Sequence, residues 1–201
     1  MRPLFFVAKF YKIWYNKAEC IKIDYGINSI TGRTFRMIIL GIDPGLATVG
    51  FGIVKFERQK FITLNYGVIT TLPRLPVHVR LQEIYDGVQQ IIDAYNPTDL
   101  AIEELFFNTN QKTIIAVSEA RGVILLAAQK NRLAIEEYTP LQVKQSVVGY
   151  GRAEKIQVMT MVKNVLNLKK IPKPDDAADA LAIAVCHAHS KSTSNLINKS
   201  T

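Results

Sequence analysis

The stretch MIILGIDPG, residues 37–45, joins a short apolar run to an acid and a Pro-Gly pair. An isoleucine-rich run of this length, bounded by turn-forming residues, predicts a buried strand over residues 38–43. Pro44 and Gly45 end the strand and leave Asp43 at its carboxyl end. Ligand sites of open α/β sheets lie along that edge. Asp43 is therefore a candidate site residue, although an Asp before Pro-Gly also commonly serves only to form a turn.

The pattern beyond this strand predicts two further strands and then alternating helices and strands. Residues 50–57 and 61–70 are typical of a hairpin, because the turn-like segment ERQK joins them. The other expected elements are a helix over 77–95, a strand over 99–105, a helix over 112–130, a strand over 133–138 and helices beyond Pro140. A hairpin followed by strand-helix alternation indicates an α/β protein with a mixed five-stranded sheet flanked by helices.

Length and charge limit the class of protein. A chain of 201 residues with 48% hydrophobic content suits one sizeable core. The net charge of +8 favours a polyanionic partner, but residues 1–36 hold 7 Lys and Arg against 2 Asp and Glu, whereas residues 37–201 hold 18 against 15. The main part of the chain is thus only mildly basic. Binding to nucleic acid must depend on where its charges lie.

The chain is expected to divide into an extension, a folded domain and a tail. Residues 1–36 are interpreted as a flexible or mis-included N-terminal extension, since Lys9 and Lys12 interrupt a signal-like pattern. The folded domain is expected over residues 37–189, and residues 190–201 are expected to form a disordered polar tail.

Cysteine content and hydropathy suggest a location. Cys20 and Cys186 are the only cysteines and have no disulfide-framework spacing, which fits a reducing, cytoplasmic setting. The apolar stretches are shorter than the roughly 18 to 20 residues of a membrane span, so no membrane association is expected.

Two acids follow the strand expected over residues 99–105. Glu103 and Glu104 come directly after Leu100-Ala101-Ile102. Strand alternation puts them on opposite faces, so only one can point toward Asp43. Both can instead be solvated charges at a strand end. A buried, isolated carboxylate costs several kcal/mol or more, so it needs a cation, hydrogen bonds or a raised pKa.

A second pair of acids opens an alanine-rich helix. Asp176 and Asp179 share a helix face one turn apart, while Asp175 points elsewhere. First-turn acids often only complement the helix dipole, which gives Asp175 and Asp176 a plausible structural role. Asp179 lies a full turn inside the helix and is harder to explain in that way. His187 and His189 follow on the same helix and are left unassigned, because histidines near a polar tail are more often exposed than metal ligands.

Two strand-borne acids and a helical pair are the donors that two-metal phosphodiester hydrolysis requires. Carboxylate oxygens hold Mg²⁺ or Mn²⁺, and two such ions roughly 4 Å apart activate a water and stabilise the leaving oxygen. The sequence therefore predicts a site for two metal ions.

Several blocks of the chain resemble the bacterial Holliday junction resolvase family RuvC, in matching order. These blocks are ILGIDPG at residues 39–45, AIE at 101–103, VKQSVVG at 143–149, AEK at 153–155 and DAADALA at 176–182. The resemblance spans residues 37–189. It implies an RNase H-like nuclease domain, a homodimer, and Mg²⁺-dependent, paired, symmetric nicking of four-way DNA junctions during recombination and repair. It also implies a branch-migration motor complex as partner.

The resemblance assigns roles residue by residue. It makes Asp43, Glu103, Asp176 and Asp179 the metal-binding catalytic acids, which selects Glu103 over Glu104. Phe106 matches an aromatic that stacks on unpaired bases, although core packing competes and Phe107 is adjacent. Lys144 and Lys155 match basic residues that contact phosphates, and Arg152 is a further candidate phosphate contact or an exposed charge.

Two departures and three competing interpretations accompany this resemblance. Residues 1–36 have no counterpart in the family pattern, and Asp175 adds an acid that either perturbs metal binding or caps the helix. The GIDPG block also resembles the phosphate loop of actin-like ATPases and sugar kinases, but such enzymes need roughly two domains. Another RNase H-like nuclease would use the same acids, whereas a non-catalytic junction-binding protein would not need them.

The apolar helix over residues 112–130 is a candidate for dimer contacts or for a buried core helix.

Overall fold

The structure is a computed structural model that describes residues 36–105 and 111–197. Its elements in chain order are β1 Arg36–Asp43, β2 Thr48–Glu57, β3 Lys60–Thr70, α1 Val77–Tyr95, β4 Asp99–Glu103, α2 Gln111–Lys130, β5 Ala134–Tyr138, α3 Pro140–Val148, α4 Lys155–Val165 and α5 Asp175–Ile197. The expected order of strands and helices is confirmed. The expected extension over residues 1–36 lies outside the described residues, except that Arg36 begins β1.

The five strands form one mixed sheet in the order β3-β2-β1-β4-β5. The β1–β2 and β2–β3 pairs are antiparallel, and the β1–β4 and β4–β5 pairs are parallel. β4 ends at Glu103, two residues before the expected end, because its last registered partner on β5 is Tyr138 and the chain then enters α3 at Pro140. The sheet edge at this end carries the carboxyl ends of β1, β4 and β5.

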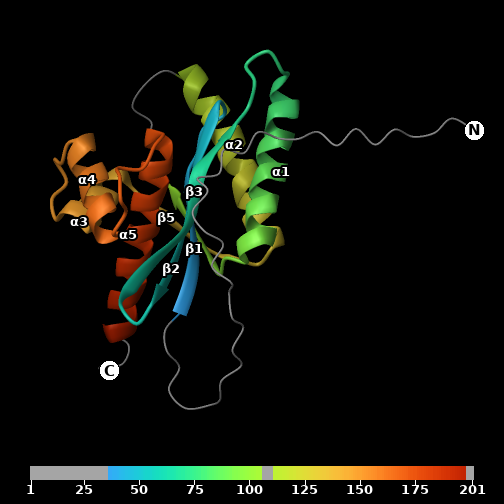
Figure 1. Ribbon diagram of the computed structural model, residues 1–201. Coiled ribbons are helices and arrows are strands. Elements are labelled where there is room, and N and C mark those ends of the chain that lie inside the picture. Colours follow the sequence, from blue (N-terminus) through green and yellow to red (C-terminus); the bar gives the residue numbers. More distant parts are fainter. Residues whose placement is uncertain (1–35, 106–110, 198–201) are drawn as a thin grey trace, which may run out of the picture.

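Helices cover both faces of the sheet, with α1 and α2 on one side and α3, α4 and α5 on the other (Figure 1). The side chains of β1 alternate between the two cores: Leu40 and Ile42 pack toward α1 and α2, and Ile39 packs toward α5. On β4, Ala101 belongs to the α5 side. The same alternation places Asp43 and Glu103 on the face that α5 covers.

Glycines let the backbone of α5 approach the sheet closely. A Cβ built on Gly50 would lie 2.0 Å from the carbonyl oxygen of Asp176, and one built on Gly41 would lie 2.2 Å from that of Ala180. Both distances are far below van der Waals contact, so only glycine fits at these positions. The first turns of α5 therefore rest directly on β1 and β2.

The disordered tail expected from Ser190 is wrong for the described part of it, because α5 continues to Ile197. Polar side chains in this segment find partners far away in the sequence. Lys191 Nζ lies 2.6 Å from Glu136 on β5, and Ser192 Oγ accepts a hydrogen bond of 2.9 Å from Gln59 in the β2–β3 turn. These contacts stabilise the last turns of the helix against the sheet. Within the described ranges, no helix has the length and hydropathy that crossing a membrane requires.

Candidate active site

Asp43 and Glu103 lie side by side at the carboxyl edge of the sheet. They end β1 and β4, which are parallel neighbours with Ile42 registered opposite Ile102, one step before the two acids. Glu103 is half-buried and accepts a hydrogen bond from the Asp43 carboxyl group. Glu104, in contrast, is exposed. Register and alternation together therefore bring Glu103, and not Glu104, to Asp43.

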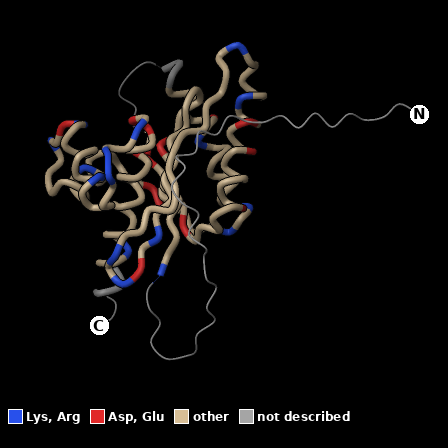
Figure 2. The backbone as a smooth tube through the Cα atoms, in the orientation of Figure 1, with Lys and Arg blue, Asp and Glu red and all other residues tan. Residues whose placement is uncertain are grey.

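α5 brings Asp176 and Asp179 to the same edge. The close approach at Gly41 and Gly50 places the first turns of this helix over the ends of β1 and β2. Both acids are near enough for their negative charges to raise the pKa of Asp43. Figure 2 shows acidic segments along the boundary between α5 and the sheet, with basic segments in the neighbouring α3 and α4 region.

Two of the four acids, Asp43 and Glu103, resist ionisation. Burial, reinforced by the charges of Glu103, Asp179 and Asp176, raises the pKa of Asp43 from 3.8 to about 8. Burial and the charge of Asp179 also raise the pKa of Glu103, although the hydrogen bond from Asp43 and the charge of Lys155 partly oppose this rise. Carboxyl groups that resist ionisation in this way are stabilised by an added cation.

The donor set fits a hard divalent cation. All four side chains offer carboxylate oxygens, which suit Mg²⁺ or Mn²⁺ better than softer metals. In the described ranges, no group of three or more Asp, Glu, His or Cys side chains is gathered closely enough to hold a metal ion as the side chains stand. The ammonium group of Lys155 supplies positive charge instead, at 2.9 Å from Asp179 Oδ2. The acids thus have the chemistry of a metal site, with a lysine as counter-charge.

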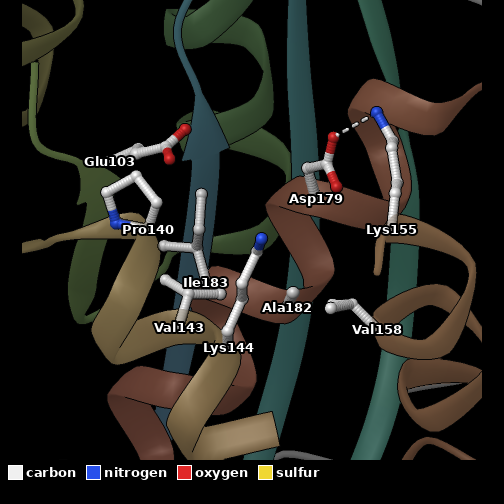
Figure 3. A pocket seen from close by; sticks show the side chains of 9 residues that line it. All are labelled: Glu103, Pro140, Val143, Lys144, Lys155, Val158, Asp179, Ala182 and Ile183. Carbon is white, nitrogen blue, oxygen red and sulfur yellow. Dashed lines mark ion pairs between the residues drawn. The ribbon is translucent and has the colours of Figure 1, made fainter. Parts of the chain in front are cut away.

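Two lysines and two of the acids surround a cavity of about 230 Å³ (Figure 3). Lys144 extends from α3, and Lys155 extends from the start of α4. The floor is largely apolar, and the lining residues are Glu103, Pro140, Val143, Lys144, Lys155, Val158, Asp179, Ala182 and Ile183. The hydrogen bond to Asp179 raises the pKa of Lys155, so this lysine stays charged. Positive charge beside clustered acids suits a phosphodiester held between metal and lysine.

Comparison with known proteins agrees with this chemistry. Residues 39–187 match the family model described as crossover junction endodeoxyribonuclease RuvC. The chain belongs to the RuvC family. A RuvC of Alkaliphilus oremlandii is 60% identical over 153 residues, covering 76% of this chain and 93% of the relative. A RuvC of Clostridioides difficile is 56% identical over 154 residues, covering 77% of this chain and 91% of the relative.

Solved structures support the same assignment. Thermus thermophilus RuvC superimposes with a TM-score of 0.74 at 36% identity, over 79% of this chain and 97% of that chain. The structure of T. thermophilus RuvC in complex with Holliday junction substrate gives a TM-score of 0.75 at 36% identity, over 79% of this chain and 96% of that chain. The predicted RNase H-like α/β fold and the predicted enzyme class, a nuclease of the metal-dependent RuvC family, are confirmed.

The remaining predicted contact residues differ in how the structure places them. Lys144 and Lys155 line the cavity, as a phosphate-contacting role requires. Arg152 is exposed in the turn between α3 and α4, outside the set that lines the cavity in the described part of the chain. Phe106 and Phe107 lie outside the described residues.

Sequence reasoning missed a buried polar network around His187. This side chain is fully buried, contrary to the expectation that the α5 histidines are exposed. Its Nε2 lies 3.2 Å from Asp99 Oδ1 and its Nδ1 lies 2.9 Å from the Tyr138 hydroxyl. Burial acts to raise the pKa of Asp99, but hydrogen bonds from His187 and Thr98 outweigh it and hold this pKa below its usual range. The available signal was helical spacing, since His187 follows the buried Ile183 by four residues.

Proposed function

We propose that this chain resolves four-way DNA junctions by paired, symmetric nicking during recombination and repair. The observation that carries the proposal is the convergence of Asp43, Glu103, Asp176 and Asp179 beside two lysines at one edge of the sheet. The related T. thermophilus protein, 36% identical, has been solved with a Holliday junction substrate. The proposed substrate is therefore junction DNA in the cytoplasm.

In this proposal the four carboxylates hold two Mg²⁺ ions, with Mn²⁺ as a substitute. When bound, such ions polarise the phosphate and lower the pKa of a coordinated water. Asp43 must lose the proton of its hydrogen bond to Glu103 before it can act as a ligand. Glu103, on the neighbouring strand, orients the Asp43 side chain through that hydrogen bond. Asp176 and Asp179 lie on the first turns of α5. The close contact of this helix backbone with Gly41 and Gly50 fixes the distance of these two acids from the sheet.

The lysines have a separate role. Lys144 and Lys155 would contact the phosphate from the cavity side, where positive charge offsets the charge that develops as the bond to the leaving oxygen breaks. Arg152 is exposed and available for a phosphate of the same strand. Phe106 is proposed to stack on an unpaired base beside the crossover.

Symmetric nicking requires two copies of the site, and α2 is the proposed contact between them. Ile115 and Leu126 on this helix are 61% and 55% exposed, although both are large apolar residues. Gly122 lies on the same helical face, and in the described part of the chain no heavy atom lies within 4 Å of a Cβ built there. Exposed apolar residues on either side of a glycine allow two helices to pack closely. The dimer would present its two sites to a nearly two-fold junction and to a branch-migration motor complex.

The deciding experiment compares a synthetic four-way junction with a linear duplex of equal length, in Mg²⁺ and in EDTA. We expect nicks at symmetric positions in two strands of the junction, in Mg²⁺ only. Equal cutting of the duplex would instead identify another RNase H-like nuclease, and junction binding without cutting would identify a binding protein.

A further inference from the structure

The ammonium group of Lys155 lies between two acids, and only one of them belongs to the proposed metal site. Its Nζ is 2.9 Å from Asp179 Oδ2 and 3.8 Å from Asp175 Oδ2. Figure 3 shows the first of these pairs at the rim of the cavity. A divalent cation bound by Asp179 would compete with Lys155 for the same carboxylate and would repel its charge.

Asp175 is suited to receive the displaced lysine. Its other oxygen, Oδ1, accepts a hydrogen bond of 2.8 Å from Lys173 Nζ, which orients the carboxylate at the start of α5. Its side chain is 43% exposed and that of Lys155 is 55% exposed. Exposed ion pairs are weak, so exchanging one acceptor for another costs little. Lys155 Nζ needs to move only roughly 1 Å to reach charge-assisted hydrogen-bond length from Asp175.

We propose that Asp175 is a positioning residue that holds Lys155 at the rim of the active site when a metal ion binds Asp179. This inference rests on the proposed function, because it takes Asp179 as a metal ligand. It gives a role to Asp175, the acid at the start of α5 that the proposed ligand set leaves out. With Asp175 present, Lys155 leaves Asp179 and still faces the phosphate. Without it, Asp179 is the remaining acid within 4 Å of Lys155 Nζ in the described ranges, and the lysine competes with the metal.

Calorimetric titration of the full chain with Mn²⁺ alone, without DNA, tests the inference. Asp175→Asn should weaken Mn²⁺ binding roughly two- to fivefold, the range of coupling that exposed ion pairs show. Asp175→Glu should restore most of the affinity. Lys155→Met should bind Mn²⁺ at least as tightly as the unaltered chain, and adding Asp175→Asn to it should cause no further loss. Glu57→Gln, which removes an acid paired with Lys55 at 2.6 Å elsewhere, is the matched control and should leave binding unchanged.

The double variant separates this role from a simple charge effect. If Asp175→Asn weakens Mn²⁺ binding equally with and without Lys155, Asp175 acts only as a nearby negative charge and the inference is overturned. Unchanged binding in Asp175→Asn also overturns it while leaving the metal site standing. Absence of Mn²⁺ binding by the unaltered chain would overturn the proposed metal site itself.

Discussion

Asp43 donates a hydrogen bond to Glu103 across the ends of two parallel strands. This shared proton is the direct result of bringing buried acids together without enough positive charge. The clustered acids make the metal-free protein less stable once Asp43 ionises, so the penalty depends on pH.

Stability of the metal-free protein should fall as pH rises from about 4 to about 8. The pKa of Asp43 is raised to about 8 in the folded chain from 3.8, so over this interval the folded state binds a proton that the unfolded state has lost. The stabilisation from this bound proton is complete below pH 3.8 and is lost as the pH rises through about 8. Asp43→Asn should remove most of this decline, leaving the smaller part due to Glu103, and raise the free energy of unfolding at pH 8 by on the order of 2–4 kcal/mol. Urea unfolding in EDTA at pH 5 and pH 8 measures it, and equal pH slopes in both proteins would contradict it.

Asp179→Asn should reduce junction nicking at least about 100-fold, because the proposed metal site loses a charged ligand. Junction binding in EDTA should remain, since the substitution removes negative charge from a surface that meets phosphates. Asp93→Asn, an exposed acid on α1 across the sheet, is the control and should behave like the unaltered chain. Nicking assays and gel-shift titrations measure the two effects. Nicking by Asp179→Asn at the unaltered rate would exclude Asp179 as a ligand.

If two chains associate through α2 as proposed, a lysine on its exposed face should convert the dimer to a monomer. Leu126→Lys places a charge on the proposed contact face of α2, and that charge would have to be buried without a partner on association. Leu72→Lys replaces a similarly exposed leucine, 51% exposed, in the segment after β3 and should leave the dimer intact. Sedimentation velocity distinguishes the two. A Leu126→Lys protein that still sediments as a dimer would show that α2 is not the dimer interface.

Gly41→Ala should cost about 3 kcal/mol of unfolding free energy, because its methyl group would overlap the Ala180 carbonyl oxygen of α5. Gln90→Ala, at an exposed position on α1, is the control and should change the unfolding free energy by no more than about 0.5 kcal/mol. Thermal unfolding compares them. Equal melting temperatures would contradict the close packing of α5 on β1.

His187→Ala should destabilise the fold by about 2–4 kcal/mol, since it empties a buried site and leaves Asp99 and Tyr138 without their shared partner. Tyr138→Phe should cost less, about 1–2 kcal/mol, because the hydrogen bonds of the hydroxyl group to His187 and Ser190 are lost but packing is kept. His78→Ala, an exposed histidine on α1, should have little effect. Urea unfolding gives all three values. A His187→Ala protein as stable as His78→Ala would show that the network contributes nothing.

Local pattern was enough for most of the fold. The helix over residues 77–95 begins and ends where apolar spacing and Asn96-Pro97 predict, because these signals act within the segment itself. The end of α5 was missed because Lys191 and Ser192 are paired with Glu136 and Gln59, which no local composition reveals. His187 was misjudged for the same reason, since its partners come from β4 and β5.

Some features of the site could be predicted from the sequence and others could not. Alternation alone showed that only one of Glu103 and Glu104 can face Asp43, and the resemblance selected Glu103. The physical reason is the parallel register of β1 and β4, which puts Glu103 on the α5 face beside Asp43. The ion pair between Lys155 and Asp179 joins α4 to α5 and could not be read from either segment.

The contact of α5 with Gly41 and Gly50 has a consequence for how this protein tolerates change. The separation between strand-borne and helix-borne acids is set by main chain resting on main chain. Replacing one apolar core side chain by another of different volume alters stability but barely alters that separation. Substitutions elsewhere in the core therefore change stability without changing the spacing of the acids. A residue larger than glycine at position 41 or 50 changes both stability and that spacing.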